Sequence, residues 1–143
     1  MSNKHYSTKQ LLQIQACTNC QACADACPAV AGSFDGKLSA AYRLKTLGRL
    51  VKARTTFWRK LGFVKEPTAE ELRAFSDTVF RCTLCGNCRQ VCPVGLDLTE
   101  LWHSIRQDLV ASDAYPGKID MIRENLDESH NVFGEDNEER AEW

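Results

Sequence analysis

The chain has 143 residues, 43% of them hydrophobic and 26% charged, which suits one globular domain with a buried core. Its formal net charge of −1 gives no overall attraction to nucleic acid or to an anionic membrane. No apolar run approaches the roughly 18 residues that a bilayer-spanning helix needs, and the first residues lack the apolar core of a secretory signal. We therefore expect a cytoplasmic protein.

The N-terminal part of the chain is predicted to be a helix followed by a metal-ligand motif. Ser7 can cap a helix whose apolar residues are Leu11, Leu12 and Ile14. Four cysteines then follow with the spacing C-x2-C-x2-C-x3-C-P: Cys17, Cys20, Cys23 and Cys27. Because the chain shows no secretory signal, such close spacing indicates metal ligands rather than disulfides.

The next part of the chain, 37–81, is predicted to be a helical insertion before a second cysteine cluster. One apolar stripe at helical spacing consists of Ala40, Leu44, Leu47 and Val51. A capping box at Thr68–Glu71 opens another helix. Its apolar face consists of Leu72, Phe75 and Val79. No alternating pattern typical of a strand is found in the sequence.

The first part of the insertion is strongly basic. Between positions 37 and 65 the basic residues, with no acidic one among them, are Lys37, Arg43, Lys45, Arg49, Lys52, Arg54, Arg59, Lys60 and Lys65. The aromatic residues interleaved with them are Tyr42, Phe57, Trp58 and Phe63. This pattern favours docking of 37–65 on a protein partner or a membrane surface, with a merely solvated face as the alternative. We expect no nucleic acid, because nothing resembles a reading module.

The second cysteine cluster repeats the first spacing, with no cysteine left over: Cys82, Cys85, Cys88 and Cys92. Two-residue gaps let three thiolates converge on one iron–sulfide cubane. The fourth cysteine lies one helical turn further on, and the proline after it blocks further helix and turns the chain. In such runs the fourth cysteine ligates the other cluster.

The repeated spacing therefore predicts two [4Fe–4S] clusters with crossed ligation, in which each motif supplies its fourth cysteine to the other motif's cluster. The first cluster is predicted to be held by Cys17, Cys20, Cys23 and Cys92. The second is predicted to be held by Cys82, Cys85, Cys88 and Cys27. Structural zinc is the alternative, but zinc takes two cysteine pairs and has no use for a third and a fourth cysteine at these spacings.

After the second motif, the sequence predicts two further helices. Asp97 can cap a helix with Leu98, Leu101, Trp102, Ile105 and Leu109 on one face. A shorter helix around Ile119, Ile122 and Leu126 is expected after the break at Tyr115–Gly117. From 98 to 143 there are twelve acidic and four basic residues. We expect 1–112 to form an all-α domain and 113–143 to form an acidic extension that docks on a partner.

The paired motifs, the helical insertion and the Val94–Asp97 run resemble the helical ferredoxin module found in the C subunit of heterodisulfide reductase. The same module is the iron–sulfur part of respiratory dehydrogenase subunits for glycerol-3-phosphate, glycolate and lactate. It is also similar to the C-terminal half of succinate dehydrogenase and fumarate reductase iron–sulfur subunits. The segment His130–Gly134, with Arg140 and Trp143, resembles the segment that precedes the CCG domain of longer relatives. The chain stops where that domain would begin, so we expect either a separate subunit with the remainder or a split or truncated form.

The resemblance implies an α-helical ferredoxin that relays single electrons through two [4Fe–4S] clusters. It would connect a dehydrogenase, flavin or membrane partner with a heterodisulfide-reductase-like partner. The implied partners are other oxidoreductase subunits: a CCG-domain protein, a flavoprotein or a membrane haem subunit. The location implied is cytoplasmic, with contact at the inner face of the cytoplasmic membrane as an option.

Whether the chain is itself an enzyme is a separate question. Cysteines fill every ligand position and no acid–base pair lies nearby, which favours a non-catalytic electron-transfer subunit of an oxidoreductase complex. One alternative is a catalytic iron–sulfur subunit that acts directly on a disulfide or an organic substrate. Another is a structural cluster module of a nucleic-acid enzyme.

Overall fold

A computed structural model describes residues 6–55 and 66–138. Within these ranges the chain forms helices and turns but no strand, so the all-α prediction is confirmed. In chain order the elements are α1 (Thr8–Ala16), α2 (Ala22–Asp25), α3 (Pro28–Ser33), the 3-10 helix η2 (Gly36–Leu38), α4 (Ala40–Thr55), α5 (Ala69–Phe80), α6 (Asn87–Gln90), α7 (Leu98–Ala111) and α8 (Lys118–Ser129). None of the helices in the described ranges has the length and apolar content to cross a bilayer.

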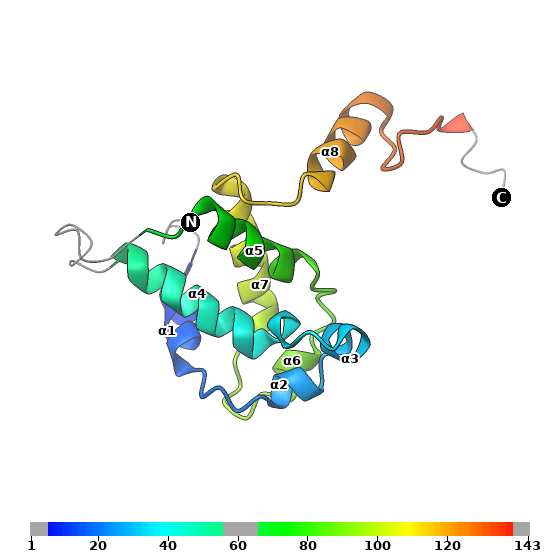
Figure 1. The fold of residues 1–143 in the computed structure, drawn as a ribbon. Helices are drawn as coiled ribbons and strands as arrows, with labels where there is room; N and C mark the ends of the chain where they lie inside the picture. Colours follow the sequence, from blue (N-terminus) through cyan, green and yellow to red (C-terminus); the bar gives the residue numbers. More distant parts are fainter. Residues whose placement is uncertain (1–5, 56–65, 139–143) are drawn as a thin grey trace.

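The core lies between the long helices of the body (Figure 1). α5 packs against α4 and α7, and α1 packs against α4. The core side chains on these helices are Ile14, Ala40, Leu44, Leu47, Leu50, Leu72, Phe75, Val79, Leu98, Leu101, Trp102, Ile105 and Leu109. Most of the apolar stripes predicted from the sequence are therefore core residues, each contributing about 1.5–3 kcal/mol when fully buried. Leu12 is an exception, because 65% of it is exposed.

Two capping boxes set where helices begin. Ser7 Oγ accepts a hydrogen bond from Gln10 N (3.2 Å), and Gln10 Oε1 accepts one from Ser7 N (2.9 Å). Thr68 and Glu71 form the same reciprocal pair at the start of α5. The Thr68 backbone N–H lowers the pKa of Glu71, and Arg49 of α4 contributes through an ion pair of 3.2 Å. These contacts also connect α4 with α5.

Two details of the predicted helix ends are wrong. Asp97 occupies the N-cap position of α7, but its side chain makes no capping hydrogen bond and lies 3.6 Å from Arg89 instead. Pro28 does not block further helix after the first motif. It is the first residue of α3, where a proline loses no hydrogen bond and its fixed φ suits the helix.

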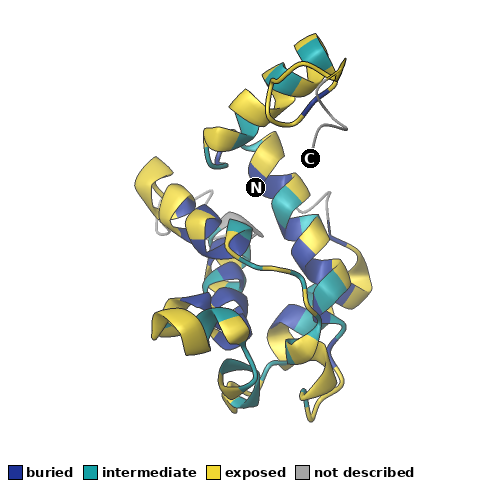
Figure 2. Cartoon of the chain, turned by 90° about the vertical axis from the view of Figure 1, so that its right-hand side faces the viewer, coloured by how far each residue is buried: buried dark blue, intermediate teal, exposed yellow. Residues whose placement is uncertain are grey.

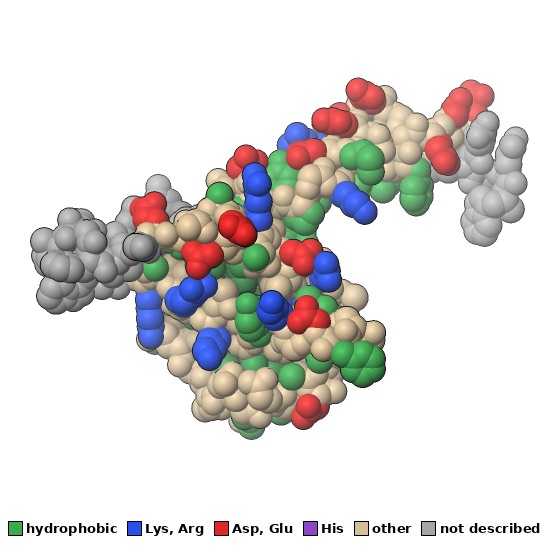
Figure 3. Space-filling model, in the orientation of Figure 1, with side chains coloured by type: hydrophobic (Ala, Val, Ile, Leu, Met, Phe, Trp, Pro, Cys, Tyr) green, Lys and Arg blue, Asp and Glu red, His purple; other side chains and the backbone are tan. Residues whose placement is uncertain are grey.

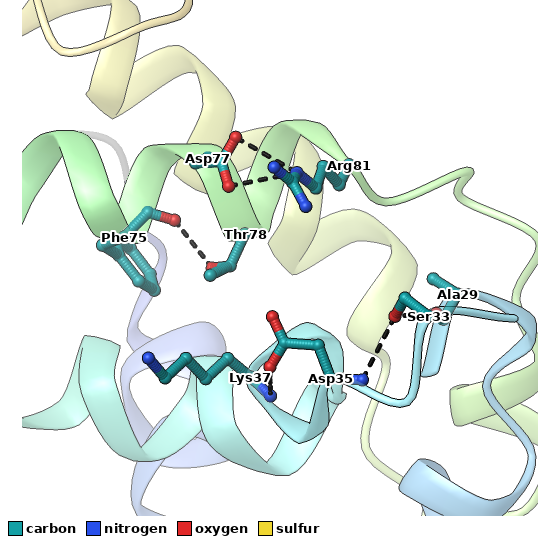
Figure 4. A network of polar contacts seen from close by, with 8 residues as sticks. All are labelled: Ala29, Ser33, Asp35, Lys37, Phe75, Asp77, Thr78 and Arg81. Atoms are coloured by element: carbon teal, nitrogen blue, oxygen red, sulfur yellow. Dashed lines mark hydrogen bonds and ion pairs between the residues drawn. The ribbon is translucent and has the colours of Figure 1, made fainter. Parts of the chain in front are cut away.

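Local hydrogen bonds fix the connection from α3 to α4 (Figure 4). Ser33 Oγ donates to Ala29 O (2.6 Å) and accepts from Asp35 N (3.2 Å). The Asp35 carboxylate accepts from Lys37 N (2.9 Å), which caps η2. Leu38 at the end of η2 is buried, and its carbonyl lies 3.9 Å from Cys27 Sγ. The loop thus ties a cysteine of the first motif to the start of α4.

The helix α8 projects away from the body (Figure 1). None of its residues is buried, and Figure 2 shows exposed and half-buried positions along its length. Its exposed apolar side chains are Met121, Ile122 and Leu126. Phe133, just beyond it, is 79% exposed. The predicted helix is therefore present, but its apolar stripe is not covered by the described part of the body; apolar side chains are visible on this arm in Figure 3.

Candidate iron–sulfur centres

The eight cysteines lie in two groups, each around its own cavity. The first cavity is lined by Cys17, Cys20, Cys23 and Cys92. The second cavity is lined by Cys82, Cys85, Cys88 and Cys27. Each cavity thus combines three cysteines of one motif with the fourth cysteine of the other. This is the grouping that crossed ligation requires, and the ligand roles themselves stay a prediction.

The two motifs reach this arrangement with the same backbone conformations. Asn19 and Gln21 in the first motif are left-handed, with φ of 57° and 68°. The equivalent Leu84 and Gly86 in the second have φ of 58° and 81°. Gln21 and Gly86 are the N-caps of the four-residue helices α2 and α6, which carry the third cysteines. Backbones that turn in this way can form concave sets of N–H groups, a feature of many iron–sulfur sites.

The two motifs are held together directly. The short helices α2 and α6 pack against each other, and Asn87 Nδ2 of α6 donates to Ala26 O (3.3 Å) in the first motif. Arg106 of α7 donates to Cys82 O (2.6 Å) and to Val79 O (3.3 Å), which fixes the start of the second motif. Arg106 is not among the residues predicted from the sequence, because only the folded structure brings it to these carbonyls.

No disulfide joins any of the eight cysteines, and all of them lie within the described ranges. Burial raises the pKa of Cys23 and of Cys88. The nearby Trp102 indole N–H lowers the pKa of Cys88 in part, although its distance and angle do not meet those of a hydrogen bond. Metal binding must deprotonate these thiols, so loading of the sites releases protons.

The donor set fits iron–sulfur clusters in number, chemistry and placement. Four soft thiol donors surround each cavity, and thiolates are the ligands that hold [4Fe–4S] clusters. Among residues 6–55 and 66–138, no three Cys, His, Asp or Glu side chains converge closely enough to hold a single metal ion. The four cysteines of each group therefore surround a cavity and do not converge on the position of a single metal ion.

The walls of the two cavities differ. Beyond its cysteines, the first is lined largely by apolar groups, which include Ala41, Leu44, Pro93, Val94, Leu96 and Leu98. The second includes Arg43 and Trp102. The prediction that Arg43 belongs to the basic docking face is wrong. Arg43 is only 2% exposed, and its Cζ lies 5.6 Å from the centre of the Trp102 ring.

The helical periodicity contained a signal for the burial of Arg43. This residue lies three positions after Ala40 and four before Leu47, and so falls within the apolar stripe of α4. The charge of the segment, taken alone, gives no indication of this position.

The other predicted docking residues are only partly described. Lys45, Arg49 and Lys52 are exposed and line a groove with Ile14 and Gly48 between α1 and α4, here called the basic groove. Tyr42 is also exposed. The predicted docking residues Phe57, Trp58, Arg59, Lys60, Phe63 and Lys65 lie outside the described residues, as do Arg140 and Trp143 of the tail.

The fold and the paired cysteine groups define the class of the protein, an all-helical protein with two iron–sulfur centres. The family is shown by the 4Fe-4S dicluster domain model, which matches residues 13–96, so the chain belongs to this family. The prediction of two [4Fe–4S] clusters is thereby confirmed, and structural zinc is set aside.

Several curated proteins are similar to the chain. The D subunit of dihydromethanophenazine:CoB–CoM heterodisulfide reductase from Methanosarcina barkeri is 32% identical over the whole chain and 36% of its own length. EtfAB:quinone oxidoreductase of Syntrophomonas wolfei is 23% identical over 96% of the chain and 22% of that protein. The Hdr-like menaquinol oxidoreductase iron–sulfur subunit 2 of Archaeoglobus fulgidus is 27% identical over 74% of the chain and 20% of that protein. The chain spans about a third of the length of the reductase subunit that it matches. No solved structure matches the chain.

Proposed function

We propose that the protein is an electron-transfer subunit that relays single electrons within a heterodisulfide-reductase-like oxidoreductase. The observation that carries this proposal is the pair of adjacent cavities, each lined by four cysteines drawn from both motifs. When bound, the two clusters supply one-electron redox chemistry. The chain holds the two cysteine groups close together, through the contact of α2 with α6, and supplies apolar walls that limit access of water.

The ligands proposed for the first cluster are Cys17, Cys20, Cys23 and Cys92. Those proposed for the second are Cys82, Cys85, Cys88 and Cys27. The grouping of these side chains around the two cavities supports the assignment. Cys20 and Cys85 are exposed, so each site has one edge that faces the solvent, where an electron donor or acceptor can approach.

A relay role is favoured over catalysis by the composition of the cavity walls. Within the described part of the chain, neither lining contains a carboxylate or an imidazole that could serve as a general acid or base. With four cysteines around each cavity, no coordination position is left for a substrate. We therefore propose a non-catalytic subunit that works with a separate catalytic or membrane partner.

The proposed partners are other oxidoreductase subunits, and two surfaces would meet them. A partner with CCG domains, a flavoprotein or a membrane haem subunit fits the relatives, whose names describe a reductase subunit, a quinone oxidoreductase and a menaquinol oxidoreductase. The basic groove would attract an acidic protein surface or an anionic membrane. The exposed apolar face of α8 would be covered by a partner subunit.

We also propose a cytoplasmic location, which includes contact with the inner face of the cytoplasmic membrane. The two closely spaced cysteine motifs support this location, because a reducing compartment keeps cysteines available as metal ligands. The acidic extension 113–143, beyond the domain 1–112, would then lie within the complex rather than in solvent.

The relay proposal is tested with the full chain, reconstituted without oxygen. We expect iron and acid-labile sulfide in equal amounts, and reversible electron exchange with a redox dye. We expect no turnover when a disulfide and a reductant are added to the isolated chain, because its walls supply no acid–base group. Turnover of the disulfide by the chain alone would contradict the relay role, and zinc in place of iron would contradict the cofactor.

The docking proposal predicts two different losses of partner binding. Arg49→Glu with Lys52→Glu should reduce the amount of partner that co-purifies from native cells at low salt. The difference from the native chain should shrink as salt is raised, since salt screens the electrostatic attraction that the substitutions remove. Ile122→Glu with Leu126→Glu should reduce co-purification at every salt concentration, because it removes an apolar contact. Arg73→Glu, a charge reversal on α5, is the matched control and should retain the partner. Unchanged co-purification in both double variants would refute docking through these surfaces.

A further inference from the structure

The second cavity contains buried hydrogen-bond donors that have no acceptor in the described chain. These donors are Arg43 Nε, Arg43 Nη2 and Trp102 Nε1. Both side chains line the cavity and are at most 2% exposed. Among residues 6–55 and 66–138, Arg43 forms no ion pair, and its described partner is the face of the Trp102 ring.

A buried guanidinium without an anion is costly. Removing a charge from water is unfavourable unless a partner of opposite sign is close, and each unmade hydrogen bond adds to the cost. A fold that keeps this group therefore implies an anionic acceptor at the same place. The thiolates and inorganic sulfides of a cluster in the second cavity are acceptors of that kind.

Among the residues that the structure describes, no equivalent cation lines the first cavity. The two cavities share α4 as a wall: Ala41 and Leu44 of this helix line the first, whereas Ala40 and Arg43 line the second. Successive positions on one helix thus give one cavity an apolar wall and the other a positive charge. The remaining polar side chains at the first cavity, Thr18 and Gln21, are neutral.

We infer that Arg43, with Trp102, donates hydrogen bonds to sulfur at the second cavity and makes the second cluster the easier of the two to reduce. The inference rests on the proposed relay function. Reduction adds one negative charge, and a nearby buried cation stabilises the more negative form. Arg43 thus acts through its positive charge, which favours the reduced form of the second cluster. Electrons would therefore pass from the first cavity toward the second.

The test is a redox titration of the reconstituted full chain, followed by EPR without oxygen. In the Arg43→Met variant, the equilibrium constant for electron exchange between the two clusters should change at least tenfold. For one electron, this corresponds to a fall of about 59 mV in the midpoint potential of the second cluster. The midpoint of the first cluster should stay in place. Trp102→Phe, which keeps an aromatic ring of smaller size and loses the N–H, should give a smaller fall. Arg43→Lys should retain most of the native potential, and Arg73→Met is the matched exposed control.

The possible results separate this inference from the relay proposal. Native protein with fewer than two reducible clusters would refute both. Two clusters whose midpoints are unchanged in Arg43→Met, or shift equally, would refute the inference alone. If Arg43→Met fails to load the second cluster, Trp102→Phe and Arg43→Lys decide: a fall in Trp102→Phe with recovery in Arg43→Lys supports the inference. Unchanged midpoint potentials in Trp102→Phe would overturn it. A fall of the second cluster's midpoint potential in Arg43→Lys as large as the loss of the charge would give would also overturn it.

Discussion

Replacing Cys27 with serine is expected to damage the cluster of the second motif, although Cys27 belongs to the first. Its Sγ lies at the cavity that Cys82, Cys85 and Cys88 line, so its loss leaves that cavity with three thiols. About half of the iron and sulfide should be lost or become labile, since one of two equal clusters is affected. Iron and sulfide analysis and EPR of the reconstituted protein measure this outcome.

The reciprocal variant provides the control. Cys92→Ser should damage the cluster at Cys17, Cys20 and Cys23 and leave the signal of the other cluster intact, because Cys92 lines the first cavity. The two variants should therefore retain different EPR signals. If Cys27→Ser instead removed the cluster of its own motif, each motif would close its own cluster and the proposed ligand sets would be wrong.

Replacing Leu101 with alanine is expected to lower the free energy of unfolding by about 2–5 kcal/mol. Leu101 is fully buried in the core on α7, and its truncation leaves a cavity in the core that α7 shares with α5. Chemical denaturation of protein kept without oxygen, followed by far-UV circular dichroism, measures the change. Cysteines of both motifs pack against this core, but Leu101 itself lines neither cavity, so the iron content of the folded variant should remain native.

Leu12→Ala is the matched control for this variant. Leu12 is also a helical leucine, but 65% of it is exposed, so its truncation should change the free energy of unfolding by no more than about 0.5 kcal/mol. Equal effects of the two substitutions would show that the packing between the long helices does not dominate stability.

The long helices were predictable because each carries a repeated physical signal. α5 has a capping box and an apolar face over twelve residues, and α7 has five core positions at helical spacing. The four-residue helices α2 and α6 were not predictable from periodicity. They are too short to show a repeat, and their N-caps depend on left-handed residues such as Gln21, whose side chain does not favour that conformation strongly.

The cysteine grouping followed from spacing, whereas the surroundings of the cysteines did not. The four-residue offset and the repeat predict which cysteines hold each cluster, and this ligand assignment stays a prediction. The burial of Arg43 was missed because a basic residue in a basic segment was assigned to the surface. Trp102 was predicted as a core residue and is one, but its place at the second cavity depends on how α7 packs. Tertiary contacts of this kind are not encoded in local patterns.

The interleaving of the two motifs has a consequence for biosynthesis. Cys92 lines the cavity of the first motif, so a nascent chain that has not yet reached this residue offers only three thiols there. Under the proposed ligand sets, the first site cannot be completed before Cys92 has been made, and the second cannot be completed before Cys88 has been made. Maturation of both centres would then wait for folding to bring the two halves together, and a fragment cut between α4 and α5 could assemble neither.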